Sequence, residues 1–226
     1  MSEIILCPPF DRLWAGRDPF IEAERLQGQV LRELDGRRTL RTEVEGRGYF
    51  VKIHRGVGWP EILKNLAYLR LPVLGARHEW QAIEFLERLG VDTLHRVAFG
   101  ERGKNPARKH SFIITEELAP TVSLEDYCRN WPQTPPNLAL KRALIKRVAN
   151  IARTLHENRM NHRDFYLCHF LLHTDPAPAP EALRLSIIDL HRALIHKHPL
   201  APRWRRKDLA ALYFSVLKIG LTRRDL

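Results

Sequence analysis

Hydrophobic and polar residues alternate in two runs near the start of the chain, a pattern typical of β-strands with one buried face. Residues 39–44 and 49–54 both alternate, and in the second run Val51 and Lys52 fall on opposite faces. An Asp-Gly step before the first run indicates a hairpin with residues 29–34. We therefore expect the three runs to form an antiparallel meander.

Helical spacing follows at residues 76–89, where Gly90 is expected to end the helix. Glu79 lies four residues before Ile83, so it falls on or beside the apolar stripe of this helix. The preceding segment, residues 56–75, carries a further amphipathic pattern. We therefore expect a packed helix after the meander, and an extra helix in the segment that joins the two.

Two more strands are expected at residues 96–101 and 111–116, after which the chain turns helical. Residues 137–158 carry apolar side chains at helical spacing, with basic residues largely outside. A short strand is expected at residues 183–188 and a last helix at residues 207–219. The order is therefore five strands with a helix, followed by a mainly helical half.

This order predicts an α+β fold with two lobes. The N-terminal lobe is expected to be an antiparallel five-stranded sheet with a helix, and the C-terminal lobe mainly helical. A break in the pattern at residues 117–121 marks the expected boundary. We expect a single domain over residues 1–226, with an N-terminal lobe at about residues 20–117 and a C-terminal lobe at about residues 121–226.

The chain is strongly basic, with a net charge of +11 from 37 Lys and Arg against 26 Asp and Glu. Such an excess favours a polyanionic partner. The partner can be a nucleic acid, a phospholipid, a phosphorylated glycan, a nucleotide or an acidic protein. Charge alone does not choose among these classes, and a basic surface without a partner is the simplest alternative.

Other features of the composition place the chain among intracellular proteins. It has no run of about 18 uncharged apolar residues, so no membrane span is expected. Its first residues carry prolines and acidic side chains in place of a secretory signal. Cys7, Cys128 and Cys168 are widely spaced and odd in number, which predicts reduced thiols and no disulfide framework.

Four features with chemical potential stand in a fixed order along the chain. They are Val51-Lys52, Glu79, His162-Arg163-Asp164 and Ile187-Ile188-Asp189. Each has a simple structural alternative: Lys52 can lie on an exposed strand face, Glu79 can be a surface acid, and Asp189 can cap a strand end. Together, their order predicts a site for phosphoryl transfer.

The residue types suit that chemistry. An ammonium group beside apolar residues needs anions to offset its desolvation, and Glu79 supplies one for Lys52. Asp164 can orient a hydroxyl and accept its proton as the phosphoryl group moves. Asp189, at the end of an apolar strand, offers the hard oxygen ligand that Mg²⁺ prefers. The histidines around Cys168 lack the spacing of a zinc finger, so zinc is not expected.

Three segments carry a resemblance to a known family. They are Tyr49-Phe50-Val51-Lys52, His162-Arg163-Asp164-Phe165-Tyr166-Leu167-Cys168-His169-Phe170-Leu171-Leu172 and Ile188-Asp189-Leu190-His191-Arg192-Ala193. The second segment is the most specific, because Asp-Phe-Tyr is followed by a Cys-His pair. With these segments the chain resembles the lipopolysaccharide core heptose (I) kinases, WaaP/RfaP type, of the protein-kinase-like superfamily. The resemblance extends over nearly the whole chain.

The resemblance implies a role for each site residue. Lys52 would contact the phosphates of ATP and pair with Glu79. Asp164 would be the catalytic base, and Asp189 would bind magnesium. His169 stands where protein kinases have a metal-binding asparagine. It would take the place of that second metal ligand, hydrogen-bond a phosphate, or orient Asp164.

The same resemblance implies that Asp208, in the last helix, braces the backbone of the catalytic loop. The chain also departs from protein kinases in two ways. Residues 35–38 occupy the hairpin that is a glycine-rich phosphate loop in those enzymes, and no Ala-Pro-Glu segment follows Asp189. Without that segment a docking platform for peptides is missing, which favours a small-molecule or glycan acceptor.

The expected function is the ATP-dependent phosphorylation of a heptose of the lipopolysaccharide inner core, with Mg²⁺. One alternative is a kinase of the same fold that acts on 3-deoxy-manno-octulosonic acid or on protein tyrosine. Another is a pseudokinase-like module that binds a membrane or an acidic partner protein. We expect the enzyme in the cytoplasm, peripheral at the cytoplasmic face of the inner membrane.

The expected partners are the core glycolipid acceptor, the anionic surface of the inner membrane and an acidic protein; nucleic acid is not expected. Residues 56–75, with Trp59, Lys64 and Arg70, are the candidate segment for contact with the membrane or the acceptor. A helix that only packs against the rest of the protein is the alternative for this segment.

Overall fold

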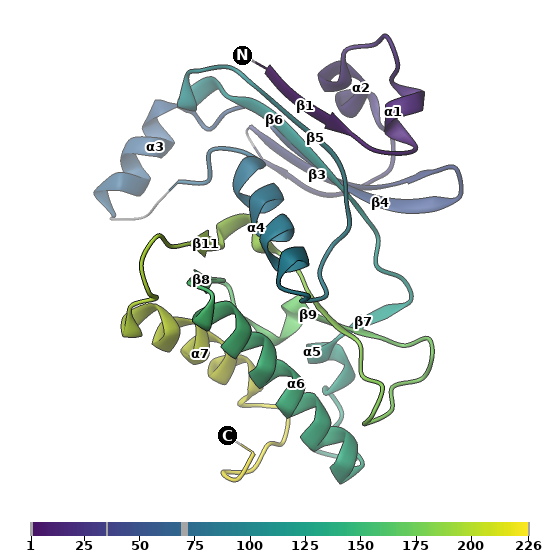
Figure 1. The fold of residues 1–226 in the computed structure, drawn as a ribbon, viewed down its shortest axis with the longest axis vertical. Coiled ribbons are helices and arrows are strands. Elements are labelled where there is room, and N and C mark those ends of the chain that lie inside the picture. Colours follow the sequence, from purple (N-terminus) through teal and green to yellow (C-terminus); the bar gives the residue numbers. More distant parts are fainter. Residues whose placement is uncertain (1, 35, 69–71, 226) are drawn as a thin grey trace. The chain divides into compact units, whose positions relative to one another are not determined.

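The structure is a computed structural model that describes residues 2–34, 36–68 and 72–225. It combines sheets and helices, labelled in Figure 1. Among the helices so described, none is both long and apolar enough to cross a lipid bilayer. Contacts between residues divide the chain into two compact units, Met1–Ile83 with Leu94–Glu117, and Glu84–Thr93 with Leu118–Leu226.

The first unit is built on one large antiparallel sheet. Its strands are β1 (Ser2–Leu6), β2 (Gln29–Leu34), β3 (Arg37–Val44), β4 (Arg47–His54), β5 (Arg96–Arg102) and β6 (His110–Glu116). They pair in the order β1-β5-β6-β4-β3-β2. The predicted meander is confirmed as β2, β3 and β4, and Asp35 of the predicted turn lies outside the described residues. The predicted count of five strands is wrong, because β1 adds an edge strand beside β5.

The alternation along β4 places one face of the sheet in the core of the first unit. Val51 and Ile53 are fully buried there, and Lys52 lies on the opposite face. Two short helices, α1 (Phe10–Leu13) and α2 (Pro19–Arg25), supply further side chains to the same core. The rings of Phe10 and Tyr49 pack edge to face, with their centroids 5.2 Å apart. The N-terminal segment therefore covers the sheet face that alternation in β4 predicts to be buried.

Two further helices belong to the segment after the meander. α3 (Gly58–Ala67) is the predicted extra helix, and α4 (Arg77–Arg88) is the predicted packed helix. Gly90 follows α4 with a φ of 67°, a value that glycine adopts without steric cost, so it ends the helix as expected. α4 buries its predicted apolar stripe, whereas α3 leaves large apolar side chains exposed at Trp59, Leu63 and Leu66.

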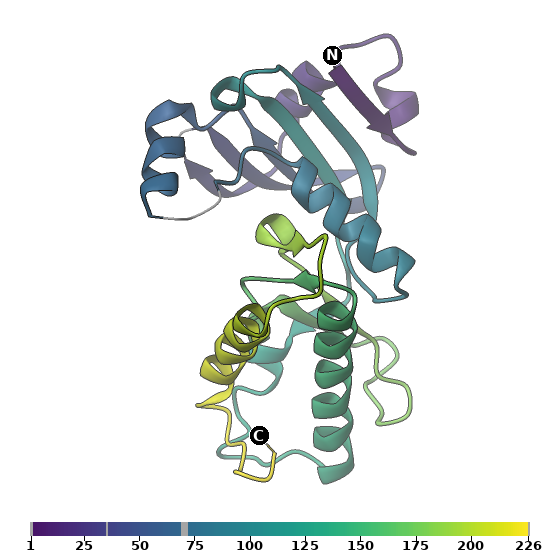
Figure 2. The same ribbon diagram turned by 60° about the vertical axis from the view of Figure 1, so that its left-hand side comes forward.

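The second unit is mainly helical, with α5 (Leu124–Tyr127), α6 (Leu138–Glu157), α7 (Pro202–Val216) and the 3₁₀ turns η2 (Leu167–His169) and η3 (Leu190–Arg192). The predicted long helix is confirmed as α6, whose N-terminus is capped by the Asn137 side chain. The last helix begins at Pro202 rather than at residue 207. Figures 1 and 2 show α6 and α7 side by side.

Short strands complete the second unit. β7 (Thr121–Ser123), β9 (Phe170–His173) and β10 (Leu185–Ile187) form a three-stranded sheet in the order β10-β9-β7. β8 (Met160–Asn161) pairs with β11 (Leu194–Ile195). Since β8 leads directly into His162 and β10 leads toward Asp189, these strands set where two of the predicted site segments begin.

The covering role of the N-terminal segment can be tested at Phe10. Phe10→Ala removes a fully buried ring from the core of the first unit and is expected to lower the free energy of unfolding by about 3–5 kcal/mol. Chemical denaturation measures this change. Leu13→Ala, on the exposed side of the same helix, is the control and should cost far less. Equal effects of the two substitutions would contradict the packing described.

Candidate active site

The loop before Asp164 is held by a buried carboxylate on α7. Asp208 is fully buried and accepts hydrogen bonds from the backbone N–H groups of His162 at 2.8 Å and Arg163 at 2.9 Å. Its Oδ2 also lies 3.1 Å from Nε2 of His156. The predicted bracing by Asp208 is thus confirmed. Arg163 adopts a φ of 73°, a conformation that non-glycine residues rarely adopt, and the two hydrogen bonds hold it there.

The carboxylate of Asp164 has a partner that sequence reasoning missed. Arg192, at the end of η3, donates a hydrogen bond from Nη1 to Oδ1 of Asp164 at 2.7 Å. The side chain of Asp164 is 15% exposed and that of Arg192 36%. Among the described residues no hydrogen bond reaches Oδ2 of Asp164. One oxygen of the Asp164 carboxylate is therefore fixed by a charge-assisted hydrogen bond, and the other has no such bond among the described residues.

His169 links the loops that carry Asp164 and Asp189. Its Nδ1 lies 2.7 Å from the backbone carbonyl of Asp164, so Nδ1 must carry the hydrogen. In the neutral ring Nε2 then presents a lone pair toward Oδ2 of Asp189, 3.4 Å away. Two acceptors that face each other repel unless a cation or a proton lies near both. Either a proton or a cation between Asp189 and His169 would relieve this repulsion.

Asp189 itself has an unusual backbone. Its φ of 61° and ψ of 51° lie in the left-handed region, and its Oδ1 is 2.5 Å from Nδ1 of His191. Within the described ranges no group of three or more His, Cys, Asp or Glu side chains is placed to hold a metal ion. A magnesium ion commonly takes one or two carboxylates and completes its shell with water and substrate phosphates. The donor set around Asp189 is compatible with that kind of site.

His162 joins the same two loops from inside the unit. It is fully buried, and burial lowers its pKa, so the ring is neutral at pH 7. Nε2 lies 2.9 Å from the carbonyl of Ile188 and donates to it. This hydrogen bond ties Ile188, which precedes Asp189, to His162, which lies two residues before Asp164. His162 is structural in this arrangement.

The predicted pairing of Lys52 with Glu79 is present in the first unit. Nζ of Lys52 lies 2.6 Å from Oε1 of Glu79. Glu79 is almost fully buried, with 1% of its side chain exposed, while 17% of the Lys52 side chain is exposed. Oε2 of Glu79 is buried without a hydrogen bond among the described residues. A buried carboxylate thus fixes an ammonium group that solvent still reaches.

Comparison with known proteins identifies the family of this chain. The family model described as "Lipopolysaccharide kinase (Kdo/WaaP) family" matches residues 22–226. The chain belongs to this family. Lipopolysaccharide core heptose(I) kinase WaaP of Pseudomonas aeruginosa is 62% identical over 222 residues, which cover 98% of this chain and 82% of that protein. The protein of the same name from Escherichia coli K12 is 53% identical over 218 residues, covering 96% and 82%.

A solved structure gives the same answer for the fold. The structure described as "WaaP in complex with acyl carrier protein" matches with a TM-score of 0.87 and 57% identity. The match covers 99% of this chain and 85% of that one. The predicted fold class is therefore confirmed for this member of the lipopolysaccharide kinase family.

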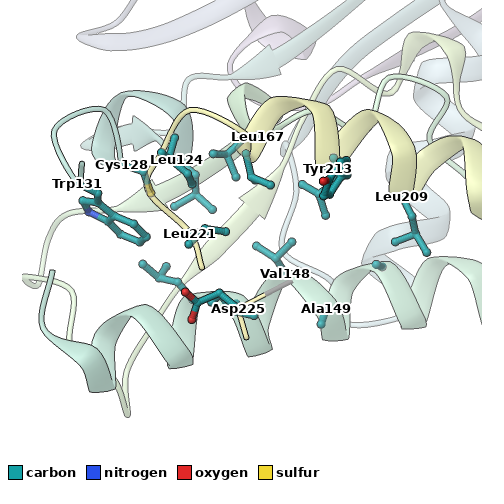
Figure 3. A pocket seen from close by; sticks show the side chains of 16 residues that line it. Leu124, Cys128, Trp131, Val148, Ala149, Leu167, Leu209, Tyr213, Leu221 and Asp225 are labelled. Atoms are coloured by element: carbon teal, nitrogen blue, oxygen red, sulfur yellow. The ribbon is translucent and has the colours of Figure 1, made fainter. Parts of the chain in front are cut away.

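A separate apolar cavity of about 360 Å³ lies in the second unit of this kinase-family chain (Figure 3). Leu209 and Tyr213 on α7 and Val148 on α6 lie on opposite sides of it. Cys128 also lines it, and burial raises the pKa of this thiol to about 12, so it stays protonated. None of the predicted site residues lines this cavity, but Leu167, three residues after Asp164, does.

The bracing of the Asp164 loop yields a stability prediction. Asp208→Asn replaces one acceptor oxygen by an amide that cannot accept, leaving a buried backbone N–H without a partner. We expect the free energy of unfolding to fall by about 1–3 kcal/mol and amide exchange at residues 162–163 to accelerate. Denaturation and hydrogen exchange by NMR measure the two effects.

The control is Asp175→Asn, which makes the same chemical change at an exposed loop position. It should leave both quantities unchanged. If exchange at residues 162–163 were equally slow in Asp208→Asn and the control, Asp208 would not be what holds the loop.

Proposed function

We propose that this chain is an ATP-dependent lipopolysaccharide core heptose(I) kinase, which transfers the γ-phosphoryl group of ATP to a hydroxyl of an inner-core heptose. The main structural support is the loop that carries Asp164. Arg192 fixes one oxygen of the Asp164 carboxylate, and Asp208 holds the backbone of the two preceding residues. Relatives that bear this activity in their names are 53–62% identical to the chain. Fold and named relatives support the same reaction.

On the acceptor side, Asp164 serves as the base. Its Oδ2 accepts a hydrogen bond from the heptose hydroxyl and takes up the proton as the bond to phosphorus forms. Arg192 keeps the carboxylate oriented, because a charge-assisted hydrogen bond at 2.7 Å resists rotation of the side chain. Catalysis here is mainly positioning, since phosphoryl transfer needs little covalent participation by the protein.

On the nucleotide side, Lys52 binds the phosphates of ATP. Glu79 is buried beside it and fixes the ammonium group by an ion pair at 2.6 Å. Breaking such a buried pair would leave a carboxylate without its counter-charge, so the pair holds its geometry before ATP arrives. The exposed part of the Lys52 side chain is what an incoming phosphate meets.

Asp189 would hold a magnesium ion, with His169 beside it. When bound, the ion neutralises charge on the phosphates that it contacts. His169 donates from Nδ1 to the Asp164 carbonyl, so it would tie the metal-binding loop to the loop of the base. We propose that the two units are the two lobes of one domain, with Lys52 and Glu79 in the first and the remaining site residues in the second.

The proposed partners follow from the acceptor. A core glycolipid is anchored in the cytoplasmic face of the inner membrane, whose anionic lipids attract basic proteins. The exposed apolar side chains of α3, including Trp59 and Leu63, lie beside Lys64 on the same helix and suit the membrane interface. Arg70 of the predicted contact segment lies outside the described residues. We also propose an acidic protein partner, because a WaaP structure contains acyl carrier protein.

The role of Asp164 is tested with Asp164→Asn. The amide cannot accept the proton, so we expect kcat with dephosphorylated core glycolipid to fall by about 10²–10⁴-fold, with little change in the KM for ATP. Phosphorylated glycolipid is quantified by mass spectrometry. Asp175→Asn is the matched control and should retain the rate of the unsubstituted protein. A rate in Asp164→Asn equal to that of the control would remove Asp164 as the base. No product with the unsubstituted protein would support a binding module in place of an enzyme.

The role of Lys52 is tested by Lys52→Gln, which removes the charge and keeps a long side chain. We expect ATP to bind at least about tenfold more weakly, because a charge-assisted contact to phosphate is lost. Isothermal titration calorimetry measures the Kd. Lys104→Gln, at an exposed turn in the same unit, is the control. An unchanged Kd for ATP in Lys52→Gln would remove Lys52 from the nucleotide site.

A further inference from the structure

The helix α7 begins with an unusual concentration of positive charge. Arg203, Arg205, Arg206 and Lys207 are all exposed, and the first turn contains no acidic residue. The N-terminal end of a helix already carries a partial positive charge, so cations there are unfavourable. Arg203 and Lys207 are also spaced four residues apart, where like charges on a helix repel. We call these four residues the α7 patch.

Neighbouring side chains do not neutralise this charge. No ion pair joins any of the four cations to an acidic side chain in the part of the chain that the structure describes. Arg203 and Lys207 instead lie against the Trp204 ring, 4.9 and 5.9 Å from its centroid. An indole face attracts cations but carries no net charge. The α7 patch therefore remains a site of net positive potential, which a bound anion would relieve.

The α7 patch is connected to the loop of the proposed base. Trp204 lies 6.2 Å from the ring of His196, measured between centroids. Nε2 of His196 is 2.7 Å from Oδ1 of Asn161, the residue just before the His162-Arg163-Asp164 motif. Burial lowers the pKa of His196, and the charges of Arg163 and Arg203 lower it further, so both guanidinium groups act on the same imidazole.

Arg192 connects the base with Arg163. It holds Asp164 through one hydrogen bond, and its backbone carbonyl lies 3.5 Å from Nη1 of Arg163. Contacts of Arg192 and Arg163 on one side, and of His196 and Trp204 on the other, thus connect the Asp164 loop with the start of α7. A ligand whose hydroxyl is at Asp164 would present neighbouring anionic groups to this surface.

We infer that the α7 patch binds carboxylate and phosphate groups of the glycolipid acceptor and thereby sets acceptor affinity. This inference rests on the proposed function, in which the acceptor is an inner core rich in acidic sugars and phosphates. The acceptor is favoured over the membrane surface because the α7 patch belongs to the same unit as Asp164. Leu209 and Phe214, farther along α7, are exposed apolar side chains of the kind that membrane-binding helices insert, so the test below includes lipid vesicles. ATP is assigned to Lys52, in the first unit.

The test compares two double variants that each remove two exposed cations from a helix of the second unit. Arg203→Gln with Lys207→Gln changes the α7 patch, and Lys146→Gln with Arg153→Gln changes α6 as the control. Glutamine is a good helix former, and the patch variant loses a repulsive pair, so its Tm should not fall. Both variants are assayed with ATP and with dephosphorylated core glycolipid in neutral detergent micelles.

We expect the KM for the glycolipid to rise at least about fivefold in the patch variant, with the KM for ATP within about twofold of the unsubstituted protein. The control should match the unsubstituted protein in both. Added salt should raise the glycolipid KM of the unsubstituted protein more than that of the patch variant, because salt screens the charges that the variant lacks. With a glycolipid whose carboxylates are reduced to alcohols, the glycolipid KM of the patch variant should differ less from that of the unsubstituted protein.

Equal glycolipid KM values in the patch and control variants would overturn the inference. So would a patch variant that loses binding only to phosphatidylglycerol vesicles, since that outcome assigns the patch to the membrane. Glycolipid binding without ATP, measured by sedimentation, separates this inference from the proposed function. If the unsubstituted protein forms no product but the patch variant binds glycolipid more weakly than the control, the function fails and the α7 patch stands.

Discussion

The hydrogen bonds of the buried Asp208 carboxylate are the interaction on which the second unit depends most. A buried carboxylate is costly unless its oxygens are satisfied, and here backbone N–H groups of two consecutive residues satisfy them. The same bonds hold Arg163 in a left-handed conformation that it would otherwise leave. Asp164 follows immediately, so the position of the proposed base is determined by a carboxylate that never touches substrate.

The two units handle charge differently. In the first unit the ammonium group of Lys52 is matched by a buried carboxylate, Glu79, before any ligand binds. In the second unit Asp164 is matched by Arg192, but the cations at the start of α7 have no acidic counterpart among the described residues. This division suits a reaction with two anionic substrates. In our proposal ATP binds at the prearranged ion pair of Lys52 and Glu79, and the acidic groups of the glycolipid neutralise the cations of the α7 patch.

Much of the first unit could be predicted because its strands have one buried face. The alternation around Val51 put Lys52 on the opposite face of the strand, and the helical spacing around Ile83 put Glu79 on or beside the buried stripe of α4. The ion pair between them is what the structure adds. β1, α1 and α2 could not be predicted in this way, because a short edge strand and helices of one or two turns show too few periods to be recognised. Their burial comes from tertiary packing, as Phe10 against Tyr49 shows.

Several features of the second unit could not be predicted from the sequence. Residues 203–207 are so basic that they concealed the start of α7, whose helical period becomes clear only after them. The contact of Arg192 with Asp164 depends on the left-handed turn at Asp189, and spacing along the chain does not reveal such a turn. Asp208 was found through the resemblance to kinases, since a lone aspartate in a basic helix has no pattern of its own.

The central claim is that this protein phosphorylates a heptose of the inner core, with Asp164 as the base. The most direct measurement is mass analysis of the products formed with ATP, magnesium and two dephosphorylated acceptors, a core glycolipid that contains heptose and a truncated glycolipid that lacks it. The account predicts one added phosphoryl group, located on heptose by fragmentation, on the first acceptor and none on the second. Phosphate on the heptose-free acceptor, or on neither, would contradict it.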